Sequence, residues 1–405
     1  MSSTAAGIDR NPGIIQAFAL LLPITMAVMG AVVLQVDQGP LMAHFGKLPD
    51  VEYLVALLLT VPAIVATLFT VVSGYLADMF GRRRVLLIAI FIYILVGVGP
   101  FFLTNFVPIL LCRIGVGLCE GVVLTVTTAM LGDYFKGRVR DRMMGWQAAI
   151  ASISASILIP LSGLLSGIIG WNGPFLIYFI SVAWLLGIYF LTWEPKPDLS
   201  AGETHGSASW AGFPWARVIE ICVVTILGSY FFYTVQYEIP KFLPNFGITD
   251  PAQQGGLMGL ASWGMAAGAL GFQLVVKRPL GILLLGELTT IAVSFIIMAF
   301  APTWQILIGA AFLNQIGCGM VLPTLLTASM RFLPFEHRGR GTGIWQGTFA
   351  SGQFVVGMSF PALKDALGGN YAHALLSVGV VATICALIAL VMAVRTHGRI
   401  APAAE

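Results

Sequence analysis

Charge is scarce in this sequence. Only 10% of its 405 residues are Asp, Glu, Lys or Arg, whereas a soluble domain carries about 25%. No long polar stretch is present in which a separate soluble domain could fold, and 58% of the residues are hydrophobic. This composition excludes an ordinary water-soluble globular protein and predicts that most of the chain lies in a membrane.

Metal-ligating and disulfide patterns are also missing. The five cysteines lie in apolar segments at spacings that suit neither zinc nor a disulfide framework, so we interpret them as small buried apolar residues. The five histidines are scattered over loops and helix ends, and no two stand at metal-ligand spacing on one helix. We therefore expect no metal site and no cofactor.

The motifs of several function classes are absent. The sequence has no Gly-x-x-x-x-Gly-Lys loop, which argues against transport driven by nucleotide hydrolysis, and nothing in it resembles an ion-channel filter. No enzyme constellation emerges, and the basic residues look like membrane-edge anchors, so we expect neither an enzyme nor a nucleic-acid partner. Residues 1–13 show no apolar region followed by a cleavage site, so no removed signal peptide is expected.

Long apolar runs dominate the chain, and each is near the ~20 residues that a helix needs to cross a bilayer. Backbone groups in lipid must satisfy their own hydrogen bonds, which requires helices. The sequence thus predicts an all-α integral membrane protein with twelve transmembrane helices. The runs are 14–43, 53–77, 85–104, 107–131, 143–168, 174–193, 216–239, 254–276, 279–301, 304–330, 342–362 and 371–394.

Basic residues fall mainly on one side of these twelve runs. If the N-terminus is inside, 17 of the 21 Lys and Arg residues lie in cytoplasmic segments, and the outer loops hold only Lys47, Lys241 and Lys364. This asymmetry predicts that both termini are cytoplasmic. Short loops favour a bacterial inner membrane.

Two halves of the chain echo each other. Arg113-Ile-Gly-Val-Gly corresponds to Gln315-Ile-Gly-Cys-Gly, and Trp146-Gln147 corresponds to Trp345-Gln346. The stretch 194–215, rich in Pro, Gly, Ser and charge, reads as a linker. We predict a first six-helix half at 1–193, a cytoplasmic linker at 194–215 and a second half at 216–405. Repeated halves with a site near the midplane are typical of secondary transporters.

The stretch 74–84, Gly-Tyr-Leu-Ala-Asp-Met-Phe-Gly-Arg-Arg-Arg, resembles the signature of the major facilitator superfamily between its second and third helices. The resemblance covers essentially the whole chain and implies two pseudo-symmetric halves, a functional monomer and likeness to drug/proton antiporters. Gly74 and Gly81 allow close backbone approach and a turn. Asp78 and Arg82 would latch the halves as a cytoplasmic gate; the alternative is a positive-inside anchor only.

Charged residues inside the apolar runs are the candidate coupling groups. Arg113 and Glu120 share one helix face, where an unpaired charge in hydrocarbon costs at least ~3 kcal/mol. Asp37 is similar to a first-helix aspartate of proton-coupled family members, and counting depth at 1.5 Å per residue predicts that it pairs with Arg113. The alternative is that Asp37 caps the outer end of its helix. Glu120, near the midplane, would bind and release a proton as access alternates; the alternative is a structural glutamate.

The second half offers a binding wall for an amphipathic organic or lipid-like substrate, because rings interspersed with amides suit such a molecule. Some of these aromatic residues could instead be interface anchors. Its equivalents of Arg113 and Glu120, Gln315 and Leu322, do not titrate, so proton chemistry should lie in the first half. The predicted substrate-binding residues are Arg113, Glu120, Tyr230, Tyr233, Gln236, Asn314, Gln315, Trp345 and Gln346.

These features predict a proton-coupled carrier that exports amphipathic small molecules by alternating access, with the substrate, protons and membrane lipids as partners. Pro160 and Gly163 partly match the signature of antiporting relatives. Two other transporters stay open, an organic-anion/proton symporter and a spinster-like lysolipid carrier, because Glu120 looks like both. A non-transporting receptor or sensor is the alternative of another class. Glu287, in the ninth apolar run, receives no role.

Overall fold

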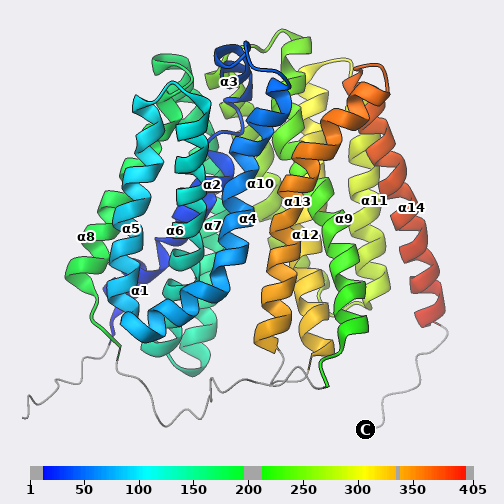
Figure 1. The fold of residues 1–405 in the computed structure, drawn as a ribbon. Helices are drawn as coiled ribbons and strands as arrows, with labels where there is room; N and C mark the ends of the chain where they lie inside the picture. Colours follow the sequence, from blue (N-terminus) through cyan, green and yellow to red (C-terminus); the bar gives the residue numbers. More distant parts are fainter. Residues whose placement is uncertain (1–11, 196–211, 334–337, 398–405) are drawn as a thin grey trace, which may run out of the picture.

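The computed structural model describes residues 12–195, 212–333 and 338–397, and within these ranges its regular structure is entirely helical (Figure 1). Most of the predicted linker 194–215 therefore lies outside the described residues. The elements are α1 (Ile14–Leu21), α2 (Ile24–Val32), α3 (Gln38–His44), α4 (Val51–Phe80), α5 (Arg82–Val98), η1 (Gly99–Phe102), α6 (Phe106–Tyr134), α7 (Gly137–Ile169), η2 (Gly173–Ile180), α8 (Ser181–Leu191), α9 (Trp215–Phe242), η3 (Leu243–Phe246), α10 (Pro251–Val275), α11 (Leu280–Ala299), α12 (Trp304–Phe332), α13 (Arg338–Ala366) and α14 (Tyr371–His397).

These helices reproduce the predicted spans. Among the described residues, eleven helical segments are long and apolar enough to cross a membrane. α13 is the remaining long helix and coincides with the predicted run 342–362. The all-α, twelve-span prediction is confirmed, with α1 and α2 together forming the first span and η2 with α8 the sixth.

The first span is broken twice, which matters for the site. α1 ends just before Pro23, because proline lacks an amide hydrogen and its ring clashes with the preceding turn. α2 then ends at Val32, and residues 33–37 are not helical before α3 begins at Gln38. The predicted continuous helix over 14–43 is therefore wrong in its outer third.

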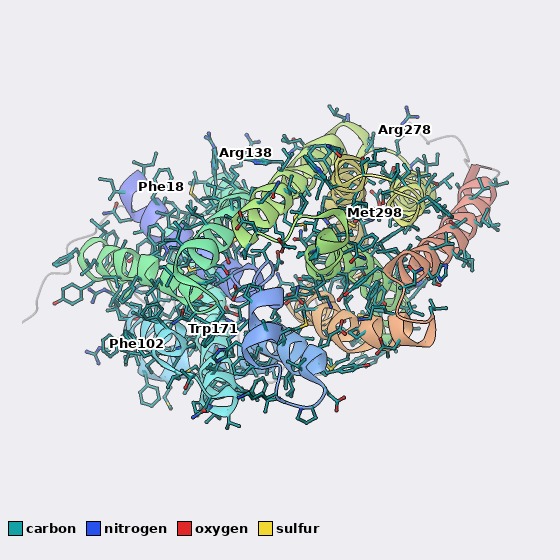
Figure 2. The ribbon with its side chains drawn as sticks, turned by 90° about the horizontal axis from the view of Figure 1, so that it is seen from above. Phe18, Phe102, Arg138, Trp171, Arg278 and Met298 are labelled. Atoms are coloured by element: carbon teal, nitrogen blue, oxygen red, sulfur yellow. The ribbon has the colours of Figure 1, made fainter. Side chains whose placement is uncertain are left out.

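Two six-helix halves stand side by side. Figure 1 shows α1 to α8 on one side and α9 and α11 to α14 on the other, with α10 of the second half between them, against α7. Seen down the bundle in Figure 2, Phe102 and Trp171 lie in the first half and Arg278 and Met298 in the second. We call the end of the bundle that carries α3 the α3 end. The opposite end is the Gly81 end, where α4 turns into α5 at Gly81, whose φ of 92° few residues other than glycine adopt.

The halves touch mainly along two helix pairs, α7 with α10 and α4 with α13, and α9 also contacts α3. The α7–α10 contact depends on small residues. A Cβ added at Gly163 would lie 2.2 Å from the carbonyl oxygen of Pro251, and one at Gly259 would lie 2.4 Å from the Pro160 ring. The Pro160 and Gly163 signature thus sits where the two halves come closest, near the α3 end.

Replacing Gly163 by Val should loosen the α3 end. Overfilling a packed contact destabilises it by about 1–3 kcal/mol, which shifts a two-state equilibrium about 5- to 150-fold. Spin labels at Lys47 and Asn245, both exposed at the α3 end, should therefore report a larger fraction of long distances in a background whose other cysteines are replaced. Gly256→Val is the matched control, because a Cβ there meets nothing within 4 Å. Identical distance distributions for the two variants would contradict this expectation.

Candidate functional site

Arg113 holds three first-half segments together. Its side chain is 1% exposed. Nε donates to the carbonyl oxygen of Leu58 in α4 at 2.8 Å, Nη1 to the Tyr178 hydroxyl in η2 at 2.6 Å, and Nη2 to the carbonyl oxygen of Gly30 in α2 at 2.7 Å. Neutral oxygens therefore stabilise this buried cation, and no carboxylate among the described residues pairs with it. The Tyr178 and Gly30 contacts carry no sequence signal, because they depend on how η2 and α2 pack on α6.

Glu120 lies two turns further along α6 and is 5% exposed. Its carboxyl packs against Gly30, where an added Cβ would lie 1.7 Å from Oε1. Oε1 is buried and has no hydrogen-bond partner. Gly30 therefore touches both charged residues, Arg113 through its carbonyl oxygen and Glu120 through its Cα.

The structure does not bring Asp37 to Arg113, so the predicted ion pair is not formed. The depth estimate assumed one continuous helix, whereas residues 33–37 leave the helical path. Asp37 is fully buried and accepts a hydrogen bond from Ser166 in α7, while its Oδ2 has no partner. The capping alternative also fails, because Asp37 precedes α3 but its side chain makes no cap hydrogen bond.

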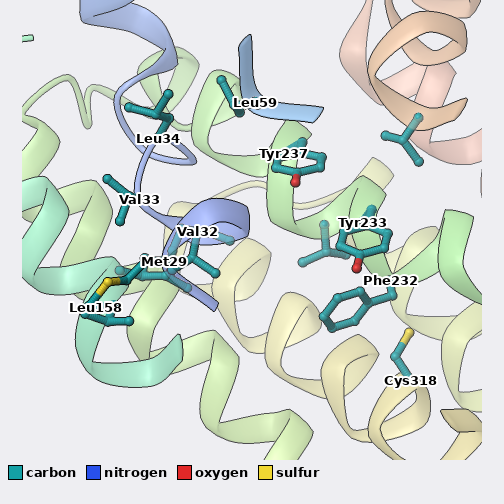
Figure 3. Packing of buried hydrophobic residues seen from close by; sticks show 14 of the residues in the cluster. Met29, Val32, Val33, Leu34, Leu59, Leu158, Phe232, Tyr233, Tyr237 and Cys318 are labelled. Atoms are coloured by element: carbon teal, nitrogen blue, oxygen red, sulfur yellow. The ribbon is translucent and has the colours of Figure 1, made fainter. Parts of the chain in front are cut away.

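An aromatic group from α9 and α13 faces these residues across the interface between the halves. The rings of Tyr233 and Tyr237 stack with centroids 5.8 Å apart. Gln353, which the sequence did not single out, accepts from the Tyr237 hydroxyl at 2.8 Å and donates to Tyr233 Oη at 2.9 Å. Figure 3 shows Tyr233 and Tyr237 on the side of α9 that faces the segment carrying Val32 and Val33.

Tyr237 also binds the first half directly. Its hydroxyl lies 3.4 Å from the carbonyl oxygen of Ala31, and its own carbonyl oxygen accepts from Gln38 Nε2 at 2.7 Å. The carbonyl of Gly30 bonds Arg113 and that of Ala31 meets Tyr237. Two neighbouring peptide groups of α2 thus join the charged pair to the aromatic group.

Three other predicted binding residues extend this wall. Trp345 stacks on Phe349 at 6.2 Å, and Phe349 lies 5.4 Å from Tyr233. Gln236 Nε2 donates to Gln315 Oε1 at 3.1 Å. Gln236 Oε1, Gln315 Nε2 and Trp345 Nε1 are buried without partners, so an acceptor and two donors remain for a ligand to satisfy.

The remaining predicted binding residues lie elsewhere. Asn314 donates to Ser294 in α11 at 3.0 Å, within the second half. Tyr230 meets the exposed Ser359 at 3.4 Å, and Gln346 is itself exposed. Asn314 and Gln346 each follow or precede a wall residue directly and are turned from it by about 100°, and the sequence did not reveal which face of each helix turns inward.

Within the described parts of the chain, the contacts of the predicted gate residues lie in the first half. Arg82 pairs with Asp133 of α6, and its Nη2 lies 3.5 Å from Asp78 Oδ1. A Cβ at Gly81 would meet the Glu194 carboxyl at 3.2 Å, whereas one at Gly74 would meet nothing within 4 Å. The cluster ties the α4–α5 turn to α6 and to the end of the first half, and no latch across the halves forms among these residues in this conformation.

Ion pairs that cross the halves lie instead at the α3 end. Glu52 in α4 lies 3.3 Å from Lys241 Nζ in α9 and 2.8 Å from Lys364 Nζ in α13. Lys241 also pairs with Glu238 at 2.7 Å. The sequence showed the lysines only as outer-loop charges, because their partner is more than a hundred residues away. The two pairs of Glu52 hold the halves together at the α3 end.

Comparison with known proteins agrees with this architecture. The family model described as Major Facilitator Superfamily matches residues 15–303 and 278–405. The chain belongs to this superfamily. It is therefore a multi-pass membrane transporter and not an enzyme, as the sequence predicted.

Individual superfamily members are distant. The chain is 21% identical over 356 residues to the glucose transporter GlcP of Staphylococcus epidermidis, covering 77% of this chain and 80% of that protein. It is 30% identical to the bacillibactin exporter of Bacillus subtilis over 135 residues, which are 32% of this chain and 34% of the exporter.

Solved superfamily structures share the fold. A D-xylose-proton symporter superposes with a TM-score of 0.77 at 16% identity, covering 94% of this chain and 97% of that one. A bacterial homolog of the human lysosomal transporter Spinster, inward-facing and unoccupied, gives 0.75 at 16% identity, covering 96% and 98%.

Proposed function

We propose that this protein is a proton-coupled secondary transporter that exports amphipathic small organic molecules by alternating access. The observation that carries the proposal is the buried carboxyl of Glu120, with Oε1 unpartnered, beside the equally buried Arg113. A carboxyl in such low-dielectric surroundings holds a proton readily and releases it when water reaches it. Asp37, buried with one free oxygen, is the second proton-exchanging group.

The substrate class follows from the wall opposite this pair. Tyr233, Phe349 and Trp345 offer a continuous aromatic surface, and the unpartnered atoms of Gln236 and Gln315 offer one acceptor and one donor. Apolar area with a few polar atoms suits an amphipathic molecule. The likeness of part of the chain to an exporter of Bacillus subtilis supports the direction of transport.

Alternating access would rock the two halves, taken as 1–193 and 216–405, about this site. The distribution of basic residues supports a cytoplasmic Gly81 end and cytoplasmic termini in a bacterial inner membrane. The conformation described is then closed to the outside by the Glu52 ion pairs. Asp78 and Arg82, with Gly74 and Gly81, would contact the second half when the Gly81 end closes. The transporter would act as a monomer among membrane lipids.

A second candidate is a carrier of anionic molecules, which is either an organic-anion/proton symporter or a spinster-like lysolipid carrier. The specific observation that favours it is Arg113, whose guanidinium bonds only neutral oxygens and so keeps its charge available for an anion. A receptor without transport would bind the same molecules on the same wall but move none of them.

Reconstituted proteoliposomes with a pH-sensitive dye test these readings. A panel of lipophilic cations, organic anions and lysolipids is added to the wild type, Asp37→Asn and Glu220→Gln, the last an exposed control. Proton movement opposite to substrate that is lost in Asp37→Asn and kept in Glu220→Gln supports the exporter. Proton movement together with an anion replaces it with the symporter, and ligand binding without flux identifies a receptor.

A further inference from the structure

Glu287 of α11 is a buried carboxyl outside the interface between the halves. It is 1% exposed. The Thr324 hydroxyl of α12 donates to Oε1 at 2.5 Å, and Oε2 has no hydrogen-bond partner. Nothing in the transport site described above contacts this residue. Burying a carboxyl with only one of its oxygens hydrogen-bonded inside a membrane helix costs free energy, and such groups commonly have a functional role.

A cavity of about 70 Å³ reaches Thr324, the hydrogen-bond partner of Glu287. Its lining residues are Phe272 and Val276 of α10, Leu280 and Leu283 of α11, and Thr324, Thr327 and Ala328 of α12. The lining follows the helix period. Leu280, Leu283 and Glu287 occupy one face of α11, and Thr324 is both a lining residue and the partner of Glu287.

This cavity extends from one end of the bundle to Thr324. Val276 follows the last residue of α10 and Leu280 is the first residue of α11, so the outer part of the cavity lies at the Gly81 end. Thr324 lies one turn deeper on α12 than Ala328. A water needs roughly 10–15 Å³ of such volume and two or more polar partners. The space and the hydroxyls of Thr324 and Thr327 meet both conditions.

We propose that Glu287 is a second proton-binding site of this transporter, loaded by water from the Gly81 end through this cavity. The inference rests on the proposed proton coupling but uses none of its residues. A proton fits the site better than a metal cation, because one carboxylate and two hydroxyls fall short of the six or more oxygen ligands that Ca²⁺ takes and of the octahedral shell of Mg²⁺.

The charged and titratable surroundings are sparse. Lys277 and Arg278 are exposed beyond the outer end of the cavity. The Cys318 thiol of α12 is buried, feels the charge of Glu287, and hydrogen-bonds to Asn314 at 3.4 Å. Among the described residues no cation pairs with Glu287 within 4 Å. Its protonation state should therefore follow water access rather than the making and breaking of an ion pair.

Infrared difference spectroscopy of the full protein in nanodiscs tests the site without any substrate. A step in pH should produce a carboxylic-acid C=O band that is present in the wild type and in Glu120→Gln and absent in Glu287→Gln. Thr324→Val removes the hydrogen bond to Glu287 and one of the two hydroxyls of the cavity but keeps the carboxyl. It should shift the frequency of that band and serves if Glu287→Gln folds poorly. Glu220→Gln, on the surface, should leave this band unchanged.

A separate variant tests whether water reaches Glu287 through the cavity. Ala328→Leu fills the lining without touching Glu287 and should slow the appearance of the band after the pH step about tenfold or more, with its amplitude retained, because the water path is blocked. No Glu287-dependent band, or one that does not change with pH, overturns the inference. If substrate drives proton flux but no such band appears, only this second site is contradicted. If the band appears but no substrate drives proton flux, only the proposed function is contradicted.

Discussion

Glu120→Gln should reduce substrate-driven proton movement to the level of protein-free liposomes, while counterflow of the same substrate continues. The amide has nearly the same shape as the protonated carboxyl and preserves the packing against Gly30, but it cannot release a proton. The transporter should therefore behave as if permanently protonated. In the same proteoliposomes, the pH-sensitive dye measures the expected loss of proton flux, and radiolabelled substrate measures the expected counterflow.

The pH dependence of counterflow gives a second readout of Glu120. Counterflow by the wild type should slow as the external medium becomes more alkaline and the Glu120 carboxyl loses its proton. The counterflow rate of Glu120→Gln should not change with pH. Glu220→Gln, whose exposed partner Arg217 lies 3.1 Å away on the surface, should keep the wild-type profile. Full proton flux in Glu120→Gln would show that this carboxyl is structural.

Gly30→Ala is expected to cost both stability and transport. The added methyl would lie 1.7 Å from Glu120 Oε1 and 2.5 Å from its Cδ, so either the carboxyl or α2 must shift. Overpacking of this kind costs about 1–3 kcal/mol. A shift of α2 would also stretch the 2.7 Å bond from Arg113 and the 3.4 Å contact of Tyr237 with Ala31. A lower melting temperature and lost flux at equal protein level are the measurable results.

Gly39→Ala is the matched control, since a Cβ there meets nothing within 4 Å. It should leave transport unchanged. Combining Gly30→Ala with Glu120→Ala removes the clash, so the double variant should recover the melting temperature but not the proton coupling, a non-additive result expected of residues in contact. A Gly30→Ala protein as stable and active as the wild type would show that Glu120 relaxes freely and that its packing has no importance.

The span pattern could be predicted because a bilayer leaves a chain few choices. A long apolar run such as 107–131 must be helical in lipid, and the structure extends it only to Phe106–Tyr134. Arg113 and Glu120 were found for the same reason, since charge stands out in such a run. Both are buried at the centre of the first half.

Which side chains contact one another could not be predicted from the sequence. Counting along one helix placed Asp37 opposite Arg113, but the break after Val32 sends it to Ser166 instead. Gln353 and Tyr178 hold central side chains, although an amide and a phenol in apolar runs give no sequence signal of that role. Asn314 was predicted as one of the amides of the binding wall, but the helix turns its side chain to Ser294 inside the second half.

The sequence by itself determined that this chain is a twelve-span, two-half membrane carrier with a charged pair in its fourth helix, because hydrophobicity, basic-residue placement and local motifs act within each segment. Only the tertiary structure decided at which end ion pairs join the halves, which ring faces which carbonyl, and that a cavity reaches Thr324, the partner of Glu287. The Glu52 ion pairs, the Gly30 contact and the α7–α10 approach join residues many helices apart. Such contacts depend on the rotation and crossing of packed helices, which no local pattern records.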